Sequence, residues 1–267
     1  MPGAPDPLYV NAREVLLDAL EALGAHRASL ILVGAQAIYL HTGEADIAVA
    51  PFTTDADVVI DPTSLADQPV LGEALQASGF VAGQDPGQWF KDEVRVDLMV
   101  PETIAGPGRR GVRMGPHGNR AARKARGLEG ALVDHETREI GSLDGPRRFA
   151  IAVAGPAALL VSKLHKLAER AEEPGRTKDK DALDLLRLLR GIDVDTLVRA
   201  IKRLLNDERS ATVTGEALQY LERLFGRPDS LGSTLAARAA EGLEPADTIQ
   251  QSCAVLANDL LSALRRS

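Results

Sequence analysis

The sequence predicts an α+β protein, in which a mixed sheet with flanking helices is followed by an α-helical C-terminal half. Two observations predict this class. Short apolar runs alternate with segments of helical spacing up to about residue 155, whereas from Pro156 almost to the end only helical spacing recurs. We therefore expect an α/β domain at residues 1–155 and an α-helical domain at residues 156–267.

The first domain alternates predicted helices with predicted strands. Helical spacing of apolar residues predicts a helix at residues 11–23. Further helices are expected at residues 35–41, directly after Gly34, and at residues 69–78, between Pro69 and Gly79. Short apolar or alternating runs predict strands at residues 29–33, 56–60, 88–91 and 94–100. Asp92 and Glu93 are expected to form a hairpin turn, and a second hairpin is expected over residues 131–154, with its turn at 143–146.

The remaining segments differ from this pattern. Residues 103–127 are rich in Gly, Pro and Arg and poor in apolar residues, which predicts a loop. The helical half is expected to be interrupted at Gly191, Gly226 and Gly232, with His165 on a helix surface. The single cysteine, Cys253, excludes an internal disulfide and is expected to be a small buried apolar residue.

Composition restricts the classes of function. The 267 residues are 45% hydrophobic and carry a net charge of −7, so contact with nucleic acid would have to be local. The first residues lack the basic and apolar regions of a signal peptide, and no apolar run approaches the ~20 residues that span a bilayer. We expect a cytoplasmic protein with no membrane partner.

Two aspartates begin the second predicted strand. Asp55 and Asp57 are two residues apart, so their carboxylates lie on the same face and repel each other. A divalent cation removes this repulsion, and Mg²⁺ prefers one or two carboxylates together with phosphates and waters. The pair therefore predicts a site for Mg²⁺ or Mn²⁺.

A third carboxylate and a glycine strengthen this hypothesis. Asp97 lies in an alternating strand and would complete a platform of three acids. Gly34 follows an apolar strand and precedes a helix, where backbone N–H groups can approach phosphate. The alternative is that Asp55 caps its strand while Asp57 and Asp97 face solvent.

These segments resemble the nucleotidyltransferase superfamily, and most of all its AbiEii/MenT-type toxin branch. The matching segments are Leu32-Val33-Gly34-Ala35, Thr53-Thr54-Asp55-Ala56-Asp57-Val58 and Val96-Asp97-Leu98. The resemblance implies metal binding by the three aspartates and nucleotide contact near Gly34, Ala35 and Thr53. Ala35 stands where the family has a second glycine or a serine, and Pro51 stands where the branch often has arginine.

The same branch has a lysine helix followed by an aspartate helix, and residues 159–170 and 180–185 are similar to these. The resemblance implies that Lys163 reaches the triphosphate and that Asp181 supports the site. The alternative is that Lys163 extends its amine to solvent and that Asp181 interacts with a helix N-terminus. Asp184 is expected at the surface or in a supporting position.

Residues 103–127 also form a basic segment. Between Glu102 and Glu129 the chain has seven basic residues and no acidic ones. Arg120, Arg123 and Lys124 are therefore candidates for contact with polyphosphate or an RNA backbone. The alternative is a solvated basic loop, or one that pairs with acidic helices.

The resemblance implies an enzyme that transfers a nucleoside monophosphate from an NTP to a hydroxyl group. Within the toxin branch this points to a tRNA 3′ end as acceptor and to a cognate antitoxin as partner. Asp97 would be a metal ligand or the general base. Two other interpretations stay open: a binding module that holds a nucleotide without turnover, and a nucleotidyltransferase for an antibiotic or a sugar.

Overall fold

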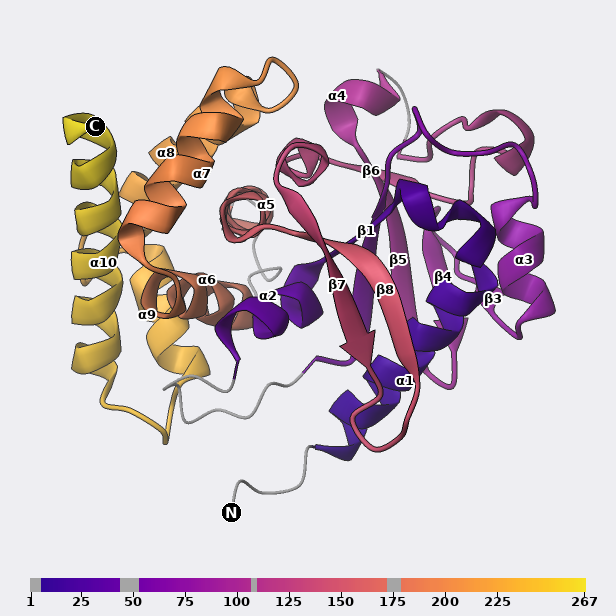
Figure 1. Ribbon diagram of the computed structural model, residues 1–267. Helices are drawn as coiled ribbons and strands as arrows, with labels where there is room; N and C mark the ends of the chain where they lie inside the picture. Colours follow the sequence, from indigo (N-terminus) through magenta and orange to yellow (C-terminus); the bar gives the residue numbers. More distant parts are fainter. Residues whose placement is uncertain (1–5, 44–52, 107–109, 172–178) are drawn as a thin grey trace. The chain divides into compact units, whose positions relative to one another are not determined.

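The computed structural model describes residues 6–43, 53–106, 110–171 and 179–267 (Figure 1). By their contacts these residues form two compact units. The first unit comprises the described parts of Met1–Ala37, Ala50–Ala125 and His135–Ala154. The second comprises the described parts of Ile38–Val49, Arg126–Asp134 and Gly155–Ser267, so it takes two short segments from before residue 155.

The first unit is built on one mixed sheet. Its strands are β1 (Leu30–Val33), β2 (Asp55–Ile60), β3 (Val81–Ala82), β4 (Gln88–Lys91), β5 (Val94–Pro101), β6 (Arg123–Ala125), β7 (His135–Gly141) and β8 (Arg148–Ala154). The strand order is β3-β4-β5-β2-β1-β8-β7, and β6 pairs with β5 off this path. Parallel pairs (β2 with β5, β1 with β8) and antiparallel pairs (β1 with β2) occur together, which confirms the mixed sheet.

Helices α1 (Pro7–Ala22), α3 (Leu71–Ala77) and α4 (Glu102–Ala105) accompany this sheet, with short 3₁₀ turns η1 (Gly24–Ser29) and η2 (Gly115–His117). The apolar face of α1 packs against β2, β5 and β8 and contacts α3 (Figure 1). This packing buries Leu16 and Leu20 completely, because their helical spacing places both on the sheet side. The α1 helix thus covers the strands that bear the acidic residues.

The second unit is helical, as its spacing predicted. It contains the turn η3 (Glu129–Leu132) and the helices α5 (Pro156–Ala171), α6 (Asp179–Gly191), α7 (Val194–Asn206), α8 (Ala211–Phe225), α9 (Leu231–Ala239) and α10 (Ala246–Arg266). Helix α5 packs against α6, α7 and α8, while α10 contacts α7, α8 and α9. Helix α2 (Gly34–Thr42) begins in the first unit and ends in the second.

The α+β class is confirmed, and the differences from the predicted elements have local causes. Helix α1 begins four residues before residue 11, because Asp6 accepts a hydrogen bond from the Leu8 N–H at 2.8 Å and Pro7 occupies the first turn. Residues 103–127 are not entirely loop, since α4 and β6 lie partly or wholly within them. The strands β3 and β6 are only two and three residues long, too short to show an alternating pattern.

Predicted features of the helical half also need correction. Gly232 does not interrupt a helix but lies within α9, where a Cβ atom would come 2.6 Å from the Phe225 ring. Glycine at this position therefore allows the Phe225 ring to pack closely against the α9 backbone. His165 is buried rather than at the surface, and its Nε2 lies 2.8 Å from the Val213 carbonyl oxygen. Cys253 is buried as expected, and burial raises the pKa of its thiol to about 12.

No helix among the described residues is both long enough and apolar enough to cross a bilayer.

Candidate active site

Four charged residues meet on one face of the sheet where β2 and β5 lie side by side. The two strands are parallel, and their register places Asp55 beside Arg95 and Asp57 beside Asp97. Because side chains alternate along a strand, all four project from the same face. We call Asp55, Asp57, Arg95 and Asp97 the charged quartet.

Gly34 borders the quartet at the junction between β1 and α2. Val33 is the antiparallel partner of Asp57, so Gly34 comes directly after the residue that faces this acid. Its φ is +72°, and a Cβ atom at this position would lie 2.2 Å from Asp57 Oδ2. Only glycine allows this approach, and it places the first turn of α2 beside the carboxylate.

Asp97 has the most buried carboxylate of the quartet. Its exposed fraction is 4%, and its Oδ1 is buried without a hydrogen-bond partner among the described residues. Burial, followed by the charge of Asp57, raises the pKa of Asp97 above its ordinary value, although Arg123 and Arg95 act in the opposite direction. A buried carboxylate oxygen without a hydrogen-bond partner of this kind can serve as a cation ligand, and a guanidinium cation already lies 3.3 Å from it.

Arg95 supplies positive charge inside the quartet. Its Nη2 donates a hydrogen bond to Asp55 Oδ2 at 3.1 Å, and its Nε lies 3.3 Å from Asp97 Oδ1. Burial by itself lowers the pKa of Arg95, but Asp97, Asp55 and Asp57 outweigh this effect and raise it. The guanidinium therefore stays charged throughout the physiological pH range.

Two residues fix the start of β2. The Thr53 hydroxyl, which was predicted to contact nucleotide, donates to Asp55 Oδ1 at 2.6 Å. The side-chain Nε2 of Gln36 donates to the backbone oxygens of Asp55 and Ala12, both at 3.3 Å. Gln36 thereby connects the start of α2 to the start of β2. Ala35 is buried beside it, and Pro51 lies outside the described residues.

The oxygen donors of the quartet fit Mg²⁺ or Mn²⁺ without forming a complete cage. No three His, Cys, Asp or Glu side chains in the described part of the chain are arranged around one metal position. At this face Asp55 interacts with Thr53 and Arg95. Asp57 and Asp97 are the remaining donors, and magnesium commonly completes two carboxylates with waters and substrate phosphates.

Sequence reasoning missed Arg95 and Gln36 as parts of this site, and it named Arg123 only as a candidate for contact with polyphosphate or RNA. A signal existed for Arg95, because it lies two residues before Asp97 in an alternating strand. None existed for Arg123, which reaches Asp97 only because β6 pairs with β5 and brings its Nη2 to 3.4 Å from Asp97 Oδ2. Both guanidiniums partly neutralise the acids.

The other basic candidates make contacts within the first unit. Nη2 of Arg120 donates to the carbonyl oxygens of Gly83 and Gln84, at 3.0 and 2.7 Å. The amine of Lys124 donates to the carbonyl of Gly106. Contact of these side chains with RNA stays a prediction, and it would require them to exchange these bonds for phosphate.

The lysine and aspartate helices of the second unit form a buried ion cluster. The Lys163 amine donates to Asp181 Oδ1 at 2.9 Å and to Asp184 Oδ2 at 2.7 Å. Asp181 also pairs with Arg170, and Lys166 Nζ lies 3.6 Å from Asp181 Oδ1. Lys163, Asp181 and Asp184 are at most 4% exposed, so Asp184 is not at the surface but supports Lys163 directly.

The cluster keeps its charges despite its burial. Burial by itself lowers the pKa of Lys163, but Asp184 and Asp181 raise it well above its ordinary value. Burial likewise raises the pKa of Asp181, but Lys163, Lys166 and Arg170 outweigh this effect and hold it below its usual range. Binding of a triphosphate by Lys163 would therefore require its amine to leave two aspartates.

The Asp181 carboxylate is expected to make the second unit acid-sensitive. Its pKa is lower in the folded state, so its contribution to stability is present above the ordinary Asp pKa of about 4 and is lost as pH falls through the folded value. The difference in unfolding free energy between wild type and Asp181→Asn should therefore shrink between pH 7 and pH 3. Urea denaturation followed by circular dichroism measures this. The exposed control Asp259→Asn should change the free energy of unfolding little at pH 7. A difference for Asp181→Asn that does not shrink as pH falls would contradict the assignment.

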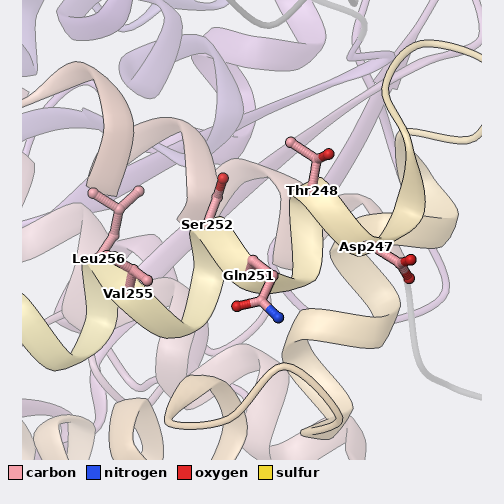
Figure 2. Close-up of a pocket in the computed structure, with 6 residues that line it drawn as sticks. All are labelled: Asp247, Thr248, Gln251, Ser252, Val255 and Leu256. Carbon is pink, nitrogen blue, oxygen red and sulfur yellow. The ribbon is translucent and has the colours of Figure 1, made fainter.

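A hollow on the surface of α10 is lined by other residues than those of the ion cluster. Figure 2 shows its lining, which comes from one face of that helix: Asp247, Thr248, Gln251, Ser252, Val255 and Leu256. Val255 is 54% exposed, and none of the six is among the buried polar or charged residues. The hollow offers no chemistry beyond that of an exposed helix face.

The geometry of this unit is thus a mixed sheet with a glycine at a strand-to-helix junction and paired acids on neighbouring strands. Residues 12–225 match the family model described as nucleotidyltransferase, and the chain belongs to this family. Comparison with curated proteins gave no match, and neither did comparison with solved structures.

Proposed function

We propose that this protein is a metal-dependent nucleotidyltransferase that moves a nucleoside monophosphate from an NTP to a hydroxyl acceptor. The observation that carries the proposal is the register of Asp57 with Asp97 beside Gly34, where Asp97 Oδ1 is buried and has no hydrogen-bond partner within the described part of the chain. Family membership supports the same reaction.

In this proposal Asp57 and Asp97 would hold Mg²⁺ or Mn²⁺. The ion would neutralise the phosphates and lower the pKa of the attacking hydroxyl. The acceptor oxygen forms a bond to the α-phosphorus, the bond from that phosphorus to the β-phosphate oxygen breaks, and pyrophosphate leaves. Asp97 Oδ1 is available as cation ligand or as acceptor of the hydroxyl proton. The Gly34 backbone lies where the first turn of α2 can receive phosphate.

For the acceptor we propose a tRNA 3′ end, with an antitoxin as protein partner. This part rests on the resemblance to the AbiEii/MenT-type branch in residues 28 to about 190. The contacts of Asp55 with Thr53 and Arg95 favour one alternative, a module that binds nucleotide without turnover. The experiment therefore has to separate transfer from binding.

The test is label transfer from each α-labelled NTP with Mg²⁺ and bulk tRNA, or with aminoglycoside and sugar-phosphate acceptors. Asp57→Asn is expected to reduce transfer about 1,000-fold, because loss of a cation ligand removes several kcal/mol of transition-state stabilisation. The exposed Asp67→Asn serves as the matched control and should retain wild-type activity.

Each outcome has a separate meaning. Label on tRNA that disappears in Asp57→Asn supports the full proposal. Label only on a small molecule keeps the enzyme class and replaces the acceptor. NTP binding without transfer to any acceptor would instead support the binding module, and absence of NTP binding would overturn the proposal.

A further inference from the structure

Arg95 lies where its charge competes with that of a divalent ion. Its guanidinium bridges Asp55 and Asp97 across neighbouring strands, through the 3.1 Å hydrogen bond to Asp55 and the 3.3 Å approach to Asp97 Oδ1. Asp97 Oδ1 is also the buried oxygen that has no hydrogen-bond partner among the described residues. A free ion on Asp57 and Asp97 would therefore meet a permanent positive charge at short range.

The same guanidinium is loosely held. It donates a hydrogen bond to Asp55, whereas Nε and Asp97 Oδ1 face each other but have no hydrogen-bond partner among the described residues. The Arg95 side chain is 32% exposed, so it can move without unpacking the sheet. Arginine binds phosphate oxygens well, because its planar fork can donate two parallel hydrogen bonds.

We propose that Arg95 is a competing cation built into the acidic site, which opposes binding of a free divalent ion and is drawn away by the triphosphate of a metal–nucleotide complex. This inference rests on the proposed function. It makes nucleotide and metal bind together: the negative phosphates would attract Arg95, and Asp97 Oδ1 would then be released to the metal on Asp57 and Asp97. Free metal ion alone provides no such compensation.

Arg123 provides an internal comparison. It also contacts Asp97, but with its Nη2 3.4 Å from Oδ2, whereas Arg95 Nε lies 3.3 Å from Oδ1. Its removal therefore takes away one positive charge without removing the guanidinium beside Oδ1. If only net charge matters, Arg95 and Arg123 have equal effects; if Arg95 occupies the metal position, its effect is larger.

The test measures binding of Mn²⁺ alone, by the electron paramagnetic resonance signal of the free ion, and then binding of the Mn²⁺ complex of a non-hydrolysable NTP analogue. Arg95→Gln is expected to bind Mn²⁺ alone about tenfold more tightly and the Mn²⁺–analogue complex about tenfold more weakly. Arg123→Gln should tighten binding of Mn²⁺ alone by less. Arg95→Lys keeps the charge and should keep weak binding of Mn²⁺ alone, while Arg148→Gln, an exposed arginine of β8, should change neither.

Equal gains in affinity for Mn²⁺ alone in Arg95→Gln, Arg123→Gln and Arg148→Gln would overturn the inference, because the affinity would then depend only on the net charge of the protein. Unchanged or weaker binding of Mn²⁺ by Arg95→Gln would also overturn it, whereas opposite effects on ion and complex support it. The proposed function is judged separately by Asp57-dependent label transfer in wild type. Transfer can persist while the inference about Arg95 fails.

Discussion

Lys163→Met is expected to lower the free energy of unfolding of the helical unit by about 3–5 kcal/mol. The amine of Lys163 is the shared partner of Asp181 and Asp184, and all three side chains are at most 6% exposed. Methionine fills similar volume but leaves Asp184 buried and charged without its lysine. Urea denaturation followed by circular dichroism at 222 nm measures the change.

Two further variants make this prediction specific. Lys202→Met, at a half-buried lysine of α7, is the matched control and should change stability by no more than about 0.5 kcal/mol. The double variant Lys163→Met/Asp184→Leu should recover much of the lost stability, because it removes the uncompensated carboxylate and leaves Asp181 with Arg170. Absence of recovery would show that packing, rather than charge, determines the effect of Lys163.

Gly34→Ala is expected to reduce nucleotidyl transfer at least about 100-fold, since displacement of a reacting group by 1 Å can have such an effect. A Cβ atom would approach Asp57 Oδ2 to 2.2 Å and Asp57 Cβ to 2.9 Å, so the carboxylate has to move. The φ of +72° adds backbone strain of about 1–2 kcal/mol for alanine. Label transfer measures the first effect and thermal denaturation the second.

The control is the glycine just beyond the other end of the same helix. Gly43 has a φ of +61°, and a Cβ added there would meet no described atom within 4 Å. Gly43→Ala therefore carries similar strain without displacing an acid, and its transfer activity should stay close to wild type. If both variants lose activity equally, backbone strain in α2 is responsible and the contact with Asp57 is not.

Much of the site was predictable because local sequence determines it. The two-residue period of a strand places Asp55 with Asp57, and Arg95 with Asp97, on common faces in any sheet that contains them. The need for glycine after β1 follows from a sharp strand-to-helix junction. Helical spacing likewise predicted the α-helical second half, although the positions of its turns were partly wrong at Gly232.

Pairings between distant segments were not predictable in the same way. The contacts of Arg123 with Asp97 and of Lys163 with Asp184 depend on which strands and helices become neighbours. Such neighbours are chosen by the packing of the whole unit, and no local period encodes them. His165 shows the same limit: a polar residue in an amphipathic helix was expected outside, but it is buried, and its Nε2 donates a hydrogen bond to the Val213 carbonyl oxygen.

The sequence by itself thus determined the class, the order of elements and the three aspartates, because hydrophobic period and residue type act over a few neighbouring residues. Only the tertiary structure decided the charge balance around those aspartates. The register of β2 with β5 aligns Asp57 with Asp97 and places Arg95 beside Asp55, and the short β6 adds Arg123. Electrostatic interactions act through space, so they depend on distances that only the assembled sheet provides.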